Sequence, residues 1–63
     1  MQMNTQDYLK KALLDTQERI RDFMNYSEKI ESRQLKSFFS NYAVSEGKQA
    51  EQLQDFIKKD EMR

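Results

Sequence analysis

The segment Lys29-Ile30-Glu31-Ser32-Arg33 decides the fold, because it separates two stretches that share one sequence period. On each side of it, residues alternately four and three apart form a ladder. The first ladder is Leu9, Leu13, Thr16, Ile20, Phe23, Ser27 and Ile30. The second ladder is Leu35, Phe39, Tyr42, Glu46, Gln49, Leu53 and Phe56. This spacing is typical of helices that pack side by side.

The five-residue step from Ile30 to Leu35 puts the two ladders out of phase, which favours a break between two helices. Ser32 can cap the second helix, and Asn4 or Thr5 can cap the first. We therefore predict an all-α chain with a single helical-hairpin domain over residues 1–63. Its helices are expected at about 5–30 and 33–59, with a turn at about 31–32. The segment contains neither Gly nor Pro, so one unbroken helix is the alternative.

Composition and charge exclude several classes of function. The chain has no Cys and no His, which excludes disulfides, the usual zinc ligand sets and Cys- or His-based nucleophiles. Eleven basic residues balance eleven acidic ones, so the electrostatic footprint of a nucleic-acid or anionic-membrane binder is absent. The longest apolar run, Ala12-Leu13-Leu14, is too short for a membrane span or a secretory signal. We expect a cytoplasmic protein without cofactor, nucleic-acid or membrane partners.

Size and patterning predict self-association. A chain of 63 residues buries little surface by itself, and without disulfides or a metal the remaining support is oligomerisation. The apolar surface is also broader than a two-helix contact requires. We predict that two antiparallel hairpins dimerise into a four-helix bundle, in either parallel or antiparallel docking. The residues expected at the dimer interface are Tyr8, Ala12, Met24, Tyr26, Phe38, Ala43, Ala50 and Ile57.

Glu46 and Gln49 interrupt the second ladder with a carboxylate and an amide. A buried polar layer can fix register and oligomer state at some cost in stability. We predict such a layer in the core, satisfied internally, by Arg19 or Arg21, or by the second copy. Its members are Thr16, Tyr42, Glu46 and Gln49. The alternative is partial exposure of the pair at the bundle surface.

The stretch 29–53 contains a helix-ending turn, a Phe seven residues before a Glu, an Ala four residues after it and a Leu three further on. These are Phe39, Glu46, Ala50 and Leu53. The pattern resembles the second helix of the rubrerythrin and ferritin-like family, which implies a ferritin-like bundle. Gln49 stands where that family has a metal-binding His, and Leu13 where it has a first-helix Glu. Glu46 is therefore the one weak metal candidate, since an amide is a poor iron ligand and leucine is none.

These features favour a non-enzymatic structural or interaction protein that self-associates without metal. One alternative is a small regulatory hairpin that lays an amphipathic face into a partner protein and inhibits it. A further alternative is a di-iron carboxylate protein assembled across a dimer. Gly47, the only glycine, lies inside a predicted helix, where it costs about 1 kcal/mol relative to alanine. We expect a close approach of the helices there.

Overall fold

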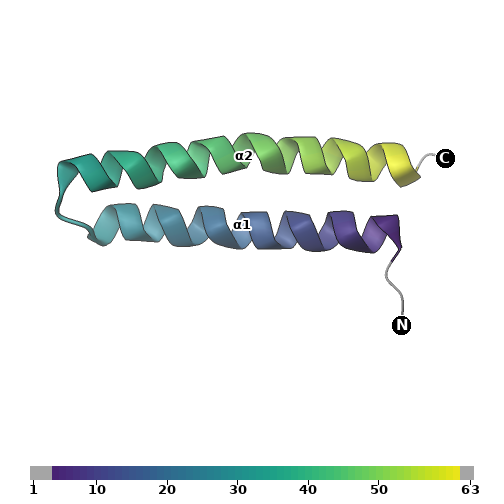
Figure 1. Cartoon of the computed structure of the whole chain (residues 1–63), viewed down its shortest axis with the longest axis horizontal. Helices are drawn as coiled ribbons and strands as arrows, with labels where there is room; N and C mark the ends of the chain where they lie inside the picture. Colours follow the sequence, from purple (N-terminus) through teal and green to yellow (C-terminus); the bar gives the residue numbers. More distant parts are fainter. Residues whose placement is uncertain (1–3, 62–63) are drawn as a thin grey trace.

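The chain folds as a hairpin of two long helices, described by a computed structural model over residues 4–61. Helix α1 spans Thr5–Lys29 and helix α2 spans Arg33–Glu61, and no strand occurs within residues 4–61. The helices run antiparallel, and the two ends of the chain lie at the same end of the hairpin (Figure 1). The predicted two-helix, all-α hairpin is confirmed, and the unbroken helix is excluded.

Local polar contacts set where each helix begins and ends. The Asn4 side chain accepts a hydrogen bond from the backbone N–H of Asp7 at 2.9 Å, and the Asp7 carboxylate accepts one from the Asn4 N–H at 3.2 Å. This capping box satisfies two backbone donors at the start of α1. At the turn, Ile30 adopts extended backbone geometry, which ends α1 without glycine. The Ser32 hydroxyl then accepts from the N–H of Leu35 at 3.3 Å, at the start of α2.

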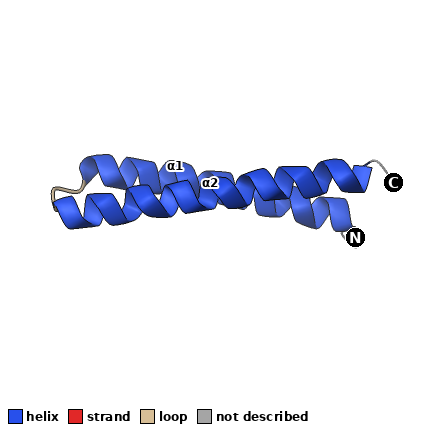
Figure 2. Cartoon of the chain, turned by 90° about the horizontal axis from the view of Figure 1, so that it is seen from above, coloured by secondary structure: helices blue, strands red, loops and turns tan. Residues whose placement is uncertain are grey.

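The hairpin is a single layer of helices. Its Cα atoms extend over 47 × 23 × 11 Å, and their radius of gyration is 14.6 Å. A compact domain of this length has a radius of gyration of about 10.6 Å. Seen from above, α1 and α2 cross at a shallow angle near their middles (Figure 2). Each helix therefore has one helical neighbour along most of its length and solvent on its other sides.

The first ladder forms the side of α1 that contacts α2, as its spacing predicted. Every residue of that ladder in α1 is buried or half-buried. In α2 the covered positions that are spaced four and three apart form what we call the inner seam, which is Phe39, Ala43, Glu46, Ala50, Leu53 and Ile57. Ser40, Gly47 and Asp60 are half-buried beside it. Four members of the second ladder are exposed instead: Leu35, Tyr42, Gln49 and Phe56. Because Phe39, Glu46 and Leu53 belong to both sets, the side of α2 that faces α1 is rotated by about half a residue step, roughly 50°, from the predicted ladder.

Small side chains explain this rotation. Ala43 and Ala50 are 4% and 8% exposed, and Thr16 is the third buried residue among those described. Alanine at these positions lets α2 lie close to α1, whereas the larger side chains one residue earlier, Tyr42 and Gln49, would hold the helices apart. No large side chain within residues 4–61 is fully buried. The two helices therefore share a line of contact, but the hairpin has no hydrophobic core of large side chains.

Aromatic residues fill the half of the hairpin next to the turn. The Phe23 ring lies 4.7 Å from the Tyr42 ring and 5.3 Å from the Phe39 ring, both in edge-on geometry. Phe38 contacts Phe39 and Tyr42 in the same geometry, at 5.5 and 6.1 Å. Edge-on pairs contribute about 0.5–1.5 kcal/mol beyond their buried area. The cluster joins the two helices on its inner side and is exposed on its outer side.

Gly47 does not mark a close approach between the helices. A Cβ atom built at this position has no neighbour within 4 Å. The expectation of tight packing there is wrong for the hairpin, because the closest positions are taken by Ala43 and Ala50.

Candidate functional site

The residues expected to form a polar layer are brought together only in part: Tyr42, Glu46 and Gln49 line one hollow on α2, but they do not form a buried layer with Thr16. Glu46 lies in the inner seam, while Tyr42 and Gln49 are on the exposed side of α2. Thr16 is buried, but its hydroxyl donates to the Ala12 carbonyl at 2.8 Å, within its own helix. The outward rotation of Tyr42 and Gln49 follows from the close contact that Ala43 and Ala50 make with α1.

The polar contact that Glu46 forms is an ion pair between the helices. Arg19 donates from Nε to Oε1 of Glu46. The Glu46 side chain is only 14% exposed, whereas that of Arg19 is 45% exposed. The hydrogen bond and then the charge of Glu46 raise the pKa of Arg19 above its ordinary value. Arg19 compensates the charge of a nearly covered carboxylate.

A shallow hollow of about 300 Å³ adjoins this pair on the outer side of α2. It is lined by Tyr42, Ser45, Glu46 and Gln49. All four come from one helix, and three of them offer only neutral hydroxyl or amide groups. Such a surface can donate and accept hydrogen bonds with a neighbouring helix, but it does not enclose a small molecule.

The donor set does not suit the di-iron centre that a rubrerythrin-like fold would carry. Glu46 is engaged by the guanidinium of Arg19, a fixed positive charge where a cation would have to bind. Within residues 4–61 no three acidic side chains gather into a possible metal site. The neighbouring positions Leu13 and Gln49 supply no strong iron ligand. We therefore derive no metal chemistry from this site.

The residues expected at a dimer interface divide into three groups. Tyr8, Met24, Tyr26 and Phe38 are exposed. Ala12 and Ile57 are half-buried. Ala43 and Ala50 require a correction: they are covered by α1 of the same chain, because α2 turns its small residues toward α1.

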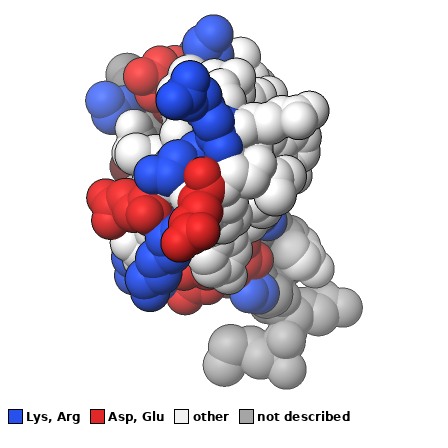
Figure 3. Space-filling model, turned by 90° about the vertical axis from the view of Figure 1, so that its left-hand side faces the viewer, with Lys and Arg blue, Asp and Glu red and all other residues white. Residues whose placement is uncertain are grey.

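A second stripe runs along α2, one residue before the inner seam. This outer stripe consists of Leu35, Phe38, Tyr42, Ser45, Gln49, Gln52 and Phe56. Its members alternate in steps of three and four, all are exposed, and none is charged. In a chain with 35% charged residues, a solvated helix face would carry several charges at seven such positions. Viewed from the turn end, uncharged side chains gather on one side of the hairpin and most charges on the other (Figure 3).

Sequence reasoning placed half of the outer stripe in the core, because it assigned the larger residues to the contact between the helices. The signal that distinguishes the two stripes is the small size of Ala43 and Ala50 beside the absence of charge at the seven outer positions. Leu14 and Val44, both exposed, were also not singled out.

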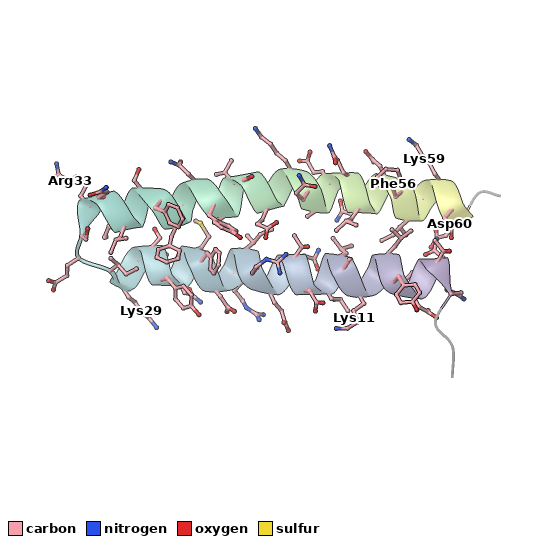
Figure 4. All side chains as sticks on the ribbon, viewed as in Figure 1. Lys11, Lys29, Arg33, Phe56, Lys59 and Asp60 are labelled. Carbon is pink, nitrogen blue, oxygen red and sulfur yellow. The ribbon has the colours of Figure 1, made fainter. Side chains whose placement is uncertain are left out.

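The open end of the hairpin is more polar. Lys59 points away from α1 and Asp60 toward it (Figure 4). The Lys59 ammonium lies 5.8 Å from the centre of the Phe56 ring, a cation–π contact within α2. These two residues and Asp60 border a hollow of about 310 Å³ with Thr5 and Leu9 of α1. The last member of the outer stripe is thus flanked by a charge at this end.

No family model matches the chain, and searches among curated proteins and among solved structures likewise give no match. Neither helix of residues 4–61 has a stretch sufficiently long and apolar to span a bilayer. The features from which a function can be inferred are therefore the inner seam and the outer stripe of α2, and the ion pair between Glu46 and Arg19 of α1.

Proposed function

We propose that this chain is a non-enzymatic structural or interaction protein whose hairpins self-associate into a four-helix bundle of the ferritin-like type, without metal. The single observation that carries the proposal is the lack of an interior. Only Thr16, Ala43 and Ala50 are buried among the described residues, and nine large apolar or aromatic side chains are exposed.

The exposed area gives this observation a magnitude. The chain exposes 5398 Å². A compact monomer of 7.6 kDa is expected to expose about 4300 Å². The excess of about 1100 Å² exceeds the roughly 800 Å² that each partner buries in a standard protein–protein interface. A dimer of hairpins would supply the missing burial.

The chemistry of the seam supports an assembly role over catalysis. Its charged pair, Arg19 with Glu46, joins the two helices and neutralises itself. The hollow beside it is shallow and lined by one helix. Side chains of this kind determine which helices pair and in which register.

Mass in solution tests the proposal. We expect sedimentation equilibrium to give a dimer, twice 7.6 kDa, and the midpoint of thermal unfolding to rise with protein concentration. Metal analysis of the same preparation is expected to give far less than one iron per chain. A monomer whose unfolding is independent of concentration would refute the proposal, and stoichiometric iron lost in Glu46→Ala would refute the statement that no metal is bound.

A second candidate function is a regulatory hairpin that binds another protein. It is favoured by Leu14, Met24 and Val44, which are exposed and lie outside the outer stripe. If these three side chains stay accessible to oxidation or labelling in the dimer, surface remains for such a partner.

A further inference from the structure

The outer stripe of α2 is a second helix-packing face of the same helix. Each of its members from Phe38 onward precedes an inner-seam residue by one position, so the two stripes are separated by about 100°. From Leu35 to Phe56 the stripe is roughly 32 Å long. Its steps of three and four are the spacing with which one helix packs against another.

We propose that the outer stripe is covered by the outer stripe of a second copy, turned end over end, so that the two α2 helices lie antiparallel at the centre of the dimer. This inference rests on the proposed self-association and adds the face and the direction of docking.

Charge favours this occupant over the other helix of a second copy. The corresponding stripe of α1, one residue before its ladder, faces the same side of the hairpin. It consists of Tyr8, Ala12, Asp15, Arg19, Asp22, Tyr26 and Lys29, four of them charged. Turning the second hairpin about its long axis would press these charges against the uncharged stripe and remove their water. Turning it end over end matches uncharged with uncharged, and an offset of the two hairpins toward α2 leaves the charged α1 stripes at the rim.

Side-chain size favours the antiparallel direction. The bulky residues Leu35, Phe38 and Tyr42 all lie toward the turn, and Ser45 lies at the middle of the stripe. In a parallel pair, Phe38 would meet Phe38 and Tyr42 would meet Tyr42. In an antiparallel pair centred near Ser45, Phe38 meets Gln52 and Tyr42 meets Gln49 of the other copy, while Ser45 faces Ser45 in either direction. The layers on each side of Ser45 then have similar volumes in the antiparallel pair, as close packing requires.

A matched pair of variants tests the face. Tyr42→Lys places a charge in the outer stripe, and Val44→Lys places the same charge about 200° around α2. Both positions are exposed in the hairpin, at 42% and 61%, but the Tyr42 ring also lies 4.7 Å from the Phe23 ring of α1. Gln49→Lys, at another exposed position of the outer stripe, is therefore made as a second stripe variant and is expected to weaken the dimer in the same way. We expect Tyr42→Lys to weaken the dimer at least about tenfold, because a symmetric interface carries the charge twice, and Val44→Lys to change it by less than about twofold.

Distances between turns test the direction. The chain has no cysteine, so Glu31→Cys provides a single attachment point for spin labels in the exposed turn. We expect a label separation of roughly 40 Å in the antiparallel dimer, against less than about 20 Å in a parallel one.

The outcomes separate the two proposals. A dimer with the long distance that Tyr42→Lys weakens supports the inference. A dimer with the short distance, or one weakened only by Val44→Lys, overturns the inference and leaves self-association intact. A wild-type chain that stays monomeric overturns both.

Discussion

The two helices use their large apolar residues differently. In α1, Leu9, Leu13, Ile20 and Phe23 face the other helix and are half-buried. In α2, Leu35, Phe38, Tyr42 and Phe56 lie on the exposed outer stripe, and alanines occupy the most buried positions. The first helix thus has one apolar face for a neighbouring helix, whereas the second helix has two such faces. Within the hairpin, α1 covers the inner seam of α2, but no helix covers the outer stripe.

Truncating the seam of α1 should have the largest effect. Phe23 contacts Tyr26, Phe39 and Tyr42, so Phe23→Ala removes a ring from the centre of the aromatic cluster. We expect a loss of about 3 kcal/mol in the free energy of unfolding, measured by urea denaturation at fixed protein concentration. Leu14→Ala, on the exposed side of α1, is the control and should change it by less than about 0.5 kcal/mol. Equal effects of the two variants would contradict the assignment of the seam.

Enlarging the inner seam of α2 should have the next largest effect. Ala43→Leu forces α2 away from α1 at its most buried position and is expected to cost about 2 kcal/mol. Val44→Leu places the same leucine side chain on the exposed side of α2 and should leave the free energy of unfolding nearly unchanged. Thermal unfolding of both variants at one concentration checks the difference. A neutral Ala43→Leu would mean that the small residues do not set the distance between the helices.

The sequence predicted some of these features and not others, for identifiable reasons. The period of both stretches, the phase shift at Ile30 and the capping groups predicted two helices and the break between them. The ladder of α1 contained the residues that are covered, since no second apolar stripe competed with it. In α2 the inner seam and the outer stripe have the same period and lie one residue apart, and the predicted ladder combined residues of both. Counting apolar residues cannot separate them, because close approach depends on small side chains.

The candidate site was predicted only in part, because the ladder predicted for α2 mixes residues of the inner seam and of the outer stripe. Glu46 belongs to the positions that the predicted second ladder shares with the inner seam, and Arg19 was one of two arginines expected beside it. Tyr42 and Gln49 belong to the outer stripe, so rotation of α2 separates them from Thr16. The roles of these residues in a dimer stay predictions.

Replacing the glycine of α2 should have a smaller effect, of opposite sign. Gly47→Ala places a Cβ atom where no atom lies within 4 Å and raises helix propensity. We expect the free energy of unfolding to rise by about 1 kcal/mol, with no change in dimer affinity, because Gly47 is outside the outer stripe. A loss of stability, or a weaker dimer, would show that another chain approaches α2 at this position.

Removing the polar pair from both stripes of α2 should have the smallest effect on stability. In Glu46→Leu with Gln49→Leu, Arg19 loses its partner but is 45% exposed and can be solvated. We expect thermal stability to be kept or slightly raised, while sedimentation shows a looser distribution of oligomers, because polar side chains fix register. A large loss of stability with the dimer unchanged would contradict this role.

The claim that α2 requires a second neighbour is tested most directly by sedimentation equilibrium combined with circular dichroism over a dilution series. The account predicts a dimer of twice 7.6 kDa at high concentration and a loss of helicity as the dimer dissociates. A helical 7.6 kDa monomer that unfolds cooperatively at micromolar concentration would contradict it.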